Sequence, residues 1–477
     1  MKRYAALAVL AAAFVATSLA GAQNPGPRRW LAGDHHVHSR YSVTWKPAAD
    51  PKDPPTPILA GDASYPIPTN AKQAYAHGLS WMVSTDHGGP RHSKLNREQA
   101  YPELLEARRE VPGLILFYGM EVDTPGADHS SLIIPRTPDE AQVLFDIESR
   151  FAKREPWPAD PSWDREPRML EALNYMKALA TPPVVIANHP ARSAQGVGVY
   201  GLDSPAELRG WNDTAPNVAI GMEGAPGHQA DALNRDGSLK PTGNRGHYQR
   251  ASTMGGFDQM TARLGGFWDS MLGEGRHWWI TATSDSHRNY TDGGFDFWPG
   301  EFAKTYVFAA KSHADILDGL RNGRVFVTAG DLISELDVTA TAGSASAAIG
   351  GTLKIKPGQD VRITIRLRDP AGANFGGRTP SVMRVDLIRS EITGRPADST
   401  VDHNASARVE TRFTPAQWTR RGEVVTMTYV LRDVRQASYI RVRGTSSPEL
   451  EPTPDPPGED PWSDLWFYAN PIFIAVG

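Results

Sequence analysis

The chain has 477 residues, of which 40% are hydrophobic and 22% are charged, as is typical of a globular protein with more than one domain. Its formal net charge of −4 gives no sign of a polyanionic partner, so we expect a small-molecule substrate and no nucleic acid. The absence of cysteine excludes disulfides and thiolate ligands, so any metal ion must be held by His, Asp or Glu. The oligomeric state does not follow from these properties.

Residues 1–22 have the pattern of a secretory signal peptide. Lys2 and Arg3 precede an apolar run, and Ala20-Gly21-Ala22 forms an A-x-A cleavage site. An uncleaved anchor is the alternative, but the run is short for a bilayer span of about 20 residues. We therefore expect cleavage, a periplasmic or secreted protein and no stable membrane span.

Residues 23–330 alternate short apolar stretches with amphipathic ones. Strands are predicted at 79–85, 114–118, 184–187, 218–222 and 278–283. Helices are predicted for NAKQAYAHG, REPRMLEALNYMKAL and FDQMTARLGGFWDSMLGEG. This alternation predicts a parallel sheet in a barrel-like α/β domain, where loops at the carboxyl ends of the strands carry the chemistry.

Two segments interrupt this pattern. Residues 45–68 are rich in proline and suit neither a helix nor a central strand, and residues 191–250 are rich in Gly, Asn and Pro. We interpret both as inserted loops that wall a functional site; surface decoration is the alternative.

Residues 331–477 have a different character. Segments such as VRITIRLRD and VVTMTYVLRD alternate apolar and polar residues between turns, which predicts a small antiparallel β-sandwich-like domain. The one histidine of this region, His403, lies in a polar loop, and we find no catalytic set around it.

The stretch GDHHVHS places three histidines within four positions. In an extended chain His36 and His38 share one face, while His35 faces the other way. Two neutral imidazoles on one face can bind a metal ion. A solvated strand end is the alternative.

Other candidate ligands also follow apolar stretches, where each predicted strand gives way to a loop. They are Asp86, His87, Glu121, His129, His189, Asp285 and His287. If the strands are parallel, these ends converge on one face. Imidazoles with carboxylates suit Zn, Mn or Fe. We therefore expect a metal site in which Asp34 and Asp86 orient imidazoles from behind.

The order and spelling of these motifs resemble the PHP (polymerase and histidinol phosphatase) family. GDHHVHS resembles its D-x-H-x-H, STDHG its T-D-H, YGMEVD its G-x-E, NHP its H-P and TSDSH its S-D-x-H, over roughly residues 29–330. The signal and the tail YANPIFIAV are similar to exported members related to carbaryl-hydrolase-type metallohydrolases. The resemblance implies a distorted (β/α)7 barrel that holds two or three divalent ions, usually Zn, Mn or Fe.

The resemblance also assigns ligands. One ion would be surrounded by His36, His38, Glu121 and Asp285. His87 and His287 would hold a second ion, and Glu121 would bridge to a third that is held with His129 and His189.

The second ion lacks one expected ligand. Family members place an Asp or His shortly after the first motif, where this chain has Val43 or Thr44. That ion would be absent, weakly bound, or completed by water or by a residue of the 45–68 loop.

Clustered divalent ions lower the pKa of bound water to about 7 and polarise a phosphoryl or carbonyl oxygen. We expect a metal-dependent hydrolase, first of all a phosphoesterase, with Asp285, His287, Glu121 and Arg192 as catalytic groups. Arg288 and Arg40 are further candidates to meet a phosphate oxygen, and Glu223 and His228 to line the pocket. The alternatives are hydrolysis of a carbamate, ester or amide, and a non-catalytic exported binding protein.

Overall fold

A computed structural model describes residues 26–477 of the chain. The predicted signal peptide lies outside the described residues, so export stays a prediction. Among the described residues, no helix combines the length and the apolar character that a membrane crossing requires.

One large sheet dominates the structure. Its order on the N-terminal side is β11-β10-β1-β4-β5-β6-β7-β8-β9. These strands are β1 (Arg29–Asp34), β4 (Trp81–Ser84), β5 (Ile115–Asp123), β6 (His129–Ile134), β7 (Val184–Ala187), β8 (Ala219–Ala225), β9 (Trp279–Ala282), β10 (Ala303–Ala309) and β11 (Val325–Ala329). The α/β class is as expected from the sequence.

The sheet is mixed rather than parallel. Strand β6 runs antiparallel to both β5 and β7, and β10 runs antiparallel to β1 and β11. Strand β9 meets β10 through a side chain: the Thr305 hydroxyl accepts from Ala282 N at 2.8 Å and donates to Ala282 O at 2.7 Å. The expected seven-stranded (β/α) barrel is therefore not confirmed in that form.

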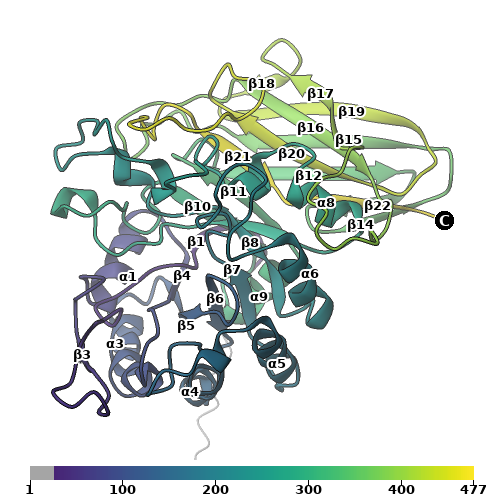
Figure 1. Cartoon of the computed structure of the whole chain (residues 1–477). Helices are drawn as coiled ribbons and strands as arrows, with labels where there is room; N and C mark the ends of the chain where they lie inside the picture. The colour runs from purple at the N-terminus through teal and green to yellow at the C-terminus, as the bar shows by residue number, and fades with distance from the viewer. Residues whose placement is uncertain (1–25) are drawn as a thin grey trace, which may run out of the picture.

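Helices cover the outer face of these strands (Figure 1). The α-helices of the described residues are α1 (Ile67–Ala76), α2 (His92–Leu95), α3 (Tyr101–Glu110), α4 (Glu140–Phe151), α5 (Glu166–Lys177), α6 (Pro205–Thr214), α7 (Gln259–Ala262), α8 (Phe267–Gly273) and α9 (His313–Arg321). The segment 191–250, expected to hold a long insertion, contains α6 and β8 as well as loops. The proline-rich segment 45–68 contains a hairpin of β2 (Thr44–Lys46) and β3 (Thr56–Ile58).

The C-terminal strands, drawn in light green and yellow in Figure 1, form one further sheet and extend the large one. A five-stranded antiparallel sheet has the order β13-β12-β15-β19-β18. Its strands are β12 (Glu335–Ala342), β13 (Ala345–Ala348), β15 (Gln359–Arg368), β18 (Thr419–Arg421) and β19 (Val424–Val434).

The other C-terminal strands extend the large sheet. They are β14 (Thr352–Ile355), β16 (Arg384–Glu391), β17 (Arg408–Phe413), β20 (Ser438–Thr445), β21 (Trp466–Ala469) and β22 (Ile472–Val476). Strand β21 pairs with β11, so the hydrogen bonding of the large sheet continues across residue 330. The domain boundary expected at residue 330 stays a prediction.

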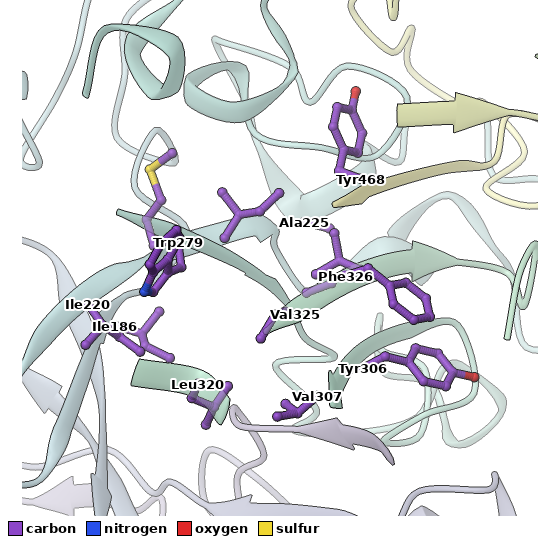
Figure 2. Packing of buried hydrophobic residues seen from close by; sticks show 14 of the residues in the cluster. Ile186, Ile220, Ala225, Trp279, Tyr306, Val307, Leu320, Val325, Phe326 and Tyr468 are labelled. Carbon is purple, nitrogen blue, oxygen red and sulfur yellow. The ribbon is translucent and has the colours of Figure 1, made fainter. Parts of the chain in front are cut away.

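The apolar core lies between the strands and the helices that cover them. Figure 2 shows Ile186, Ile220 and Trp279 from β7, β8 and β9 near Leu320 of α9 and Val325 of β11, and all five side chains are buried. Burial of each large aliphatic side chain stabilises the fold by about 1.5–3 kcal/mol. This packing fixes the strands whose ends carry the site.

Candidate metal centre

The His36–His38 segment follows the end of β1 and remains extended. Val37 N–H donates to Thr85 Oγ1 at 2.8 Å, and His38 N–H donates to Ser286 O at 3.0 Å. These bonds hold the segment between the loops that follow β4 and β9. As expected, His36 and His38 point to the same centre, whereas His35 bonds to Ser131 Oγ and Thr281 Oγ1 inside the fold.

Four fully buried side chains meet at this centre: His36, His38, Glu121 and Asp285. The Nε2 atoms of the two histidines lie 2.9 Å apart. Asp285 Oδ1 lies 3.1 Å from His36 Nε2 and 3.0 Å from His38 Nε2, and Glu121 Oε1 lies 3.1 Å from His36 Nε2. Three β-strand ends thus deliver these groups to one point.

The hydrogen bonds behind the two rings leave both Nε2 lone pairs facing inward. A carboxylate can only accept, so Glu223 Oε1, 2.7 Å from His36 Nδ1, places the His36 proton on Nδ1. Ser42 Oγ donates to Asp86 Oδ1 and lies 2.8 Å from His38 Nδ1, so it accepts from that atom. Each Nε2 is then an acceptor, which is what a metal ligand requires.

The centre fits a divalent ion. Ligand atoms about 2.0–2.1 Å from one ion lie about 3–3.4 Å from each other, close to the distances found here. Glu121 Oε2 and Asp285 Oδ1 are buried without a hydrogen-bond partner. Such orphaned charged oxygens are costly in a protein interior unless a cation contacts them. Several of these His/Asp/Glu groups could hold a metal ion.

His87 and His287 form a second group with His38 nearer the solvent. The Nε2 atoms of His87 and His287 lie 3.4 Å apart. The His287 and His38 rings stack with centroids 3.8 Å apart. The structure therefore brings together the pair assigned to a second ion.

Glu121, His129 and His189 are the residues assigned to a third ion. Glu121 and His129 form a group with His87, and His189 joins it through Glu121. Glu121 Oε1 lies 3.3 Å from His129 Nδ1 and 3.1 Å from His189 Nε2. His129 opens β6, which runs antiparallel to its neighbours, so the beginning of this strand lies where the parallel strands end. All eight residues predicted as metal ligands thus lie in one connected cluster, and their role as ligands stays a prediction.

Burial and neighbouring charges set the protonation of the cluster. Burial raises the pKa of Glu121, but the charges of His129, His36 and His87 outweigh it and hold that pKa well below its usual range. Burial and the neighbouring His287 hold the pKa of His38 well below its usual value, so this ring is neutral. Ionised acids with a neutral imidazole make a donor set for a divalent cation.

His228 and Asp296 are a pair that the motifs did not assign as ligands. His228 Nδ1 lies 2.6 Å from Asp296 Oδ1, and its Nε2 lies 2.9 Å from Asp285 Oδ2. Asp296 Oδ2 accepts from the backbone N–H of His287 and of Arg288. The pair therefore fixes the orientation of Asp285 from behind. Asp296 stands thirteen residues after the end of the predicted strand 278–283, so the sequence pattern alone gave no signal for it.

Asp123 is a further residue of the site, and the sequence pattern could have indicated it. It lies two positions after Glu121 on β5, so both side chains lie on one face of the strand, and it stands opposite His129 in the β5–β6 register. Its Oδ1 lies 3.5 Å from His129 Nε2 and 3.0 Å from Arg154 Nη1. The signal in the sequence was the two-residue spacing of the two acids in EVD, which places them on the same face of a strand.

Asp34 and Asp86 were both expected to orient imidazoles. Asp34 instead accepts from the backbone N–H groups of His36 and Ser284. Asp86 accepts from Ser39 N–H and also from Ser42 Oγ, through which it acts on the His38 ring. A short Asp side chain next to a turn reaches nearby backbone donors more readily than a ring. Their effect is to fix the loops that carry the ligands.

The backbone at the cluster adopts unusual conformations. His189, His228 and Asp285 have φ values of 30°, 55° and 46°, in a region that L residues seldom occupy. A Cβ on Gly227 would stand 2.1 Å from Asp285 Cβ and 2.2 Å from Ser284 O, so only glycine allows this close approach. These features hold Asp285 against the cluster.

A cavity of ≈ 450 Å³ opens over the cluster. His87, His129, His228 and His287 line it, with Asp62, Arg192, Arg288, Gly293, Gly294, Phe295 and Asp296. Arg192 Nη2 lies 3.0 Å from Asp128 Oδ1, and Arg288 is exposed at the rim. Arg40, the third candidate, instead turns to Glu103 and Tyr41.

The described C-terminal residues also contain an acidic group, Asp455, Glu459 and Asp464. The buried Arg245 guanidinium neutralises it: Nη1 lies 3.1 Å from Glu459 Oε2 and Nε lies 3.8 Å from Asp455 Oδ2.

No protein-family model and no curated protein matches the chain. Among solved structures, the chain is similar to Endonuclease Q in complex with a 27-mer duplex substrate that carries an abasic lesion at the active site. The sequences are 16% identical, the TM-score is 0.24, and the match covers 47% of this chain and half the length of the other. The His/Asp/Glu cluster itself could hold metal ions.

One expectation has to be corrected. The net charge was taken to exclude nucleic acid as a partner, and this exclusion is wrong, because the matched structure is an endonuclease with a duplex substrate. Net charge is an average over the whole chain, whereas a phosphodiester contacts only a few groups. Here Arg192 and Arg288 stand at the cavity despite the overall negative charge.

Proposed function

We propose that this protein is a metal-dependent phosphoester hydrolase of the PHP type, exported from the cytoplasm and similar to the carbaryl-hydrolase-related branch. The observation that carries the proposal is the cavity in which two arginines face a cluster of buried imidazoles and carboxylates. Divalent Zn, Mn or Fe ions held by that cluster would supply Lewis acidity and a water of lowered pKa.

The side chains around the cavity have separable tasks in this proposal. Asp285, Glu121 and His287 would hold the ions, and Glu121 belongs to two of the ligand groups. Arg192, anchored by Asp128, and Arg288 at the rim pair with the non-bridging phosphoryl oxygens. Phosphoryl charge is thereby neutralised from both sides.

Elemental analysis together with hydrolysis assays tests the proposal. The metal-loaded protein is assayed on p-nitrophenyl phosphate, bis-p-nitrophenyl phosphate, a duplex with an abasic lesion and a naphthyl carbamate. We expect turnover of a phosphoester, and loss of both metal and turnover in His38→Ala and Asp285→Ala.

His403→Ala is the matched control, because the His403 side chain is 70% exposed in the C-terminal region, and it should keep both properties. Turnover of the carbamate alone would replace the phosphoesterase proposal by a carbamate hydrolase. Fewer than one tightly held ion per chain would favour a non-catalytic binding protein.

A further inference from the structure

The hairpin of β2 and β3 brings Asp62 to the second ligand group. Asp62 Oδ2 lies 3.5 Å from His287 Nε2 and 3.7 Å from His87 Nε2, and these two nitrogens lie 3.4 Å apart. The three atoms form a nearly equilateral triangle. Three ligands of one tetrahedral ion at about 2.0–2.1 Å are about 3.4 Å from each other.

The hydrogen bond behind the His287 ring aims Nε2 of the neutral ring into this triangle. His287 Nδ1 lies 2.9 Å from the carbonyl oxygen of Asp285, which can only accept a hydrogen bond, so Nδ1 carries the proton in the neutral ring. His287 Nε2 then presents a lone pair toward Asp62 Oδ2, which is also an acceptor. Two acceptors that face each other at this distance are stabilised by a cation between them.

The backbone on either side of Asp62 is tied to the same site. Ser64 N–H donates to the carbonyl oxygen of His287 at 3.1 Å, and Ala63 N–H donates to Ser42 O at 3.3 Å. A Cβ on Gly61 would lie 2.2 Å from Thr44 Oγ1, so glycine lets the segment lie against β2. Asp62 is therefore held at the cavity wall and does not belong to a free loop.

We propose that Asp62 is the carboxylate ligand of a divalent ion bound by His87 and His287. This inference rests on the proposed function, in which the family position for an acid is occupied by Val43 or Thr44. Val43 is a buried apolar side chain and Thr44 is a neutral residue of β2, so neither supplies a carboxylate. The inserted segment thus supplies from residue 62 the charge that the first motif lacks.

Metal binding to the full chain tests this inference independently of activity. Zn²⁺ and Mn²⁺ are titrated by calorimetry into apo-protein, and bound metal per chain is counted after dialysis. In Asp62→Ala we expect one ion per chain to be lost or bound at least ten-fold more weakly, while the ion at His36 and His38 remains. Asp62→His, which restores a ligand of another kind, should recover most of the affinity.

Asp53→Ala is the matched control, since it removes an exposed aspartate of the same hairpin segment. The Asp62 side chain is 40% exposed, so its truncation should leave the apo-protein melting temperature unchanged. If Asp62→Ala and wild type bind the metal with equal stoichiometry and affinity, the inference is overturned. Asp62 would then only form an ion pair with His287. A wild type that binds both ions but hydrolyses no phosphoester would refute the proposed function and leave the role of Asp62 intact.

Discussion

Glu223 joins two of the ligand-bearing loops through a single carboxylate: Oε1 lies 2.7 Å from His36 Nδ1, and Oε2 accepts from the His189 backbone N–H at 2.7 Å. Glu223 is fully buried and also accepts from Thr283 Oγ1 at 2.9 Å. It therefore sets the tautomer of one ligand and the position of another at once.

Replacement of Glu223 by glutamine should weaken metal binding without removing a ligand. An amide keeps one acceptor for His36, but its NH₂ group then faces the His189 N–H, and two donors repel. Loss of such an outer partner typically costs 10–100-fold in metal affinity. Competition with a chromogenic chelator measures the change. Glu274→Gln, a buried carboxylate that pairs with Arg209 and Arg276, should leave the affinity unchanged.

Addition of one methyl group at Gly227 should displace Asp285. The new Cβ would overlap Asp285 Cβ and the Ser284 carbonyl oxygen. Both are held by His228, whose Nε2 lies 2.9 Å from Asp285 Oδ2 and whose N–H donates to Ser284 O at 3.3 Å. We expect Gly227→Ala to lose tightly bound metal and to melt at a lower temperature, with a cost of about 1–3 kcal/mol for such overpacking. Gly372→Ala, where nothing lies within 4 Å, is the control. Normal metal content in Gly227→Ala would show that the loop yields easily.

The sequence predicted the elements whose pattern is local. Residues 184–187 form β7 as expected, and HxH, T-D-H and S-D-x-H place their imidazoles in one cluster because period-two alternation and strand ends can be read from a single segment. The direction of β6 could not be predicted, since SLII has the same pattern whether the strand runs parallel or antiparallel to its neighbours.

The contacts that sequence reasoning did not specify run across the fold. Glu223 was expected only to line the pocket, and it contacts His36 from 187 positions away. Asp62 reaches His287 from a proline-rich segment that carries no ligand motif. Such contacts depend on how loops pack, which composition and spacing do not encode. The closure of β9 on β10 through the Thr305 hydroxyl is another example.

The two arginines at the cavity should matter for charged substrates only. Arg192→Ala and Arg288→Ala should each lower kcat/KM for a phosphoester by about 10–100-fold, which corresponds to about 1.4–2.7 kcal/mol of lost charge-assisted hydrogen bonding. Hydrolysis of a neutral ester should change little. Arg395→Ala, in a side chain that is 65% exposed and paired with Asp213, serves as control. An equal loss on both substrates would argue against phosphate recognition.

Stability should fall at alkaline pH because of His92. This buried ring has Nδ1 at 2.6 Å from Glu148 Oε1 and Nε2 at 3.0 Å from Tyr41 O. Burial lowers the pKa of His92, but the charge and hydrogen bond of Glu148 outweigh it and raise that pKa to about 9. The folded value exceeds the unfolded value of about 6.5, so the contribution is complete below pH 6.5 and is lost as pH rises through 9.

The size of this contribution is of the order of 3 kcal/mol. Free energies of unfolding from denaturant titrations between pH 6 and 10, compared between wild type and His92→Gln, isolate it. The difference between the two proteins should shrink steadily over that range. A constant difference would mean that His92 is neutral in the folded state.

Metal removal should destabilise the protein through the two orphaned oxygens, Glu121 Oε2 and Asp285 Oδ1. Both belong to buried carboxylates that contact several imidazoles, so a cation that binds only the folded state adds stability. At a free concentration of 100 times its Kd, one bound ion contributes about 2.7 kcal/mol. Thermal melts after dialysis against a chelator, with and without added Zn²⁺ or Mn²⁺, should therefore show a higher Tm with metal. His38→Ala should lose this shift in Tm, while His403→Ala should keep it. A wild-type Tm that changes with neither chelator nor metal would contradict the metal centre.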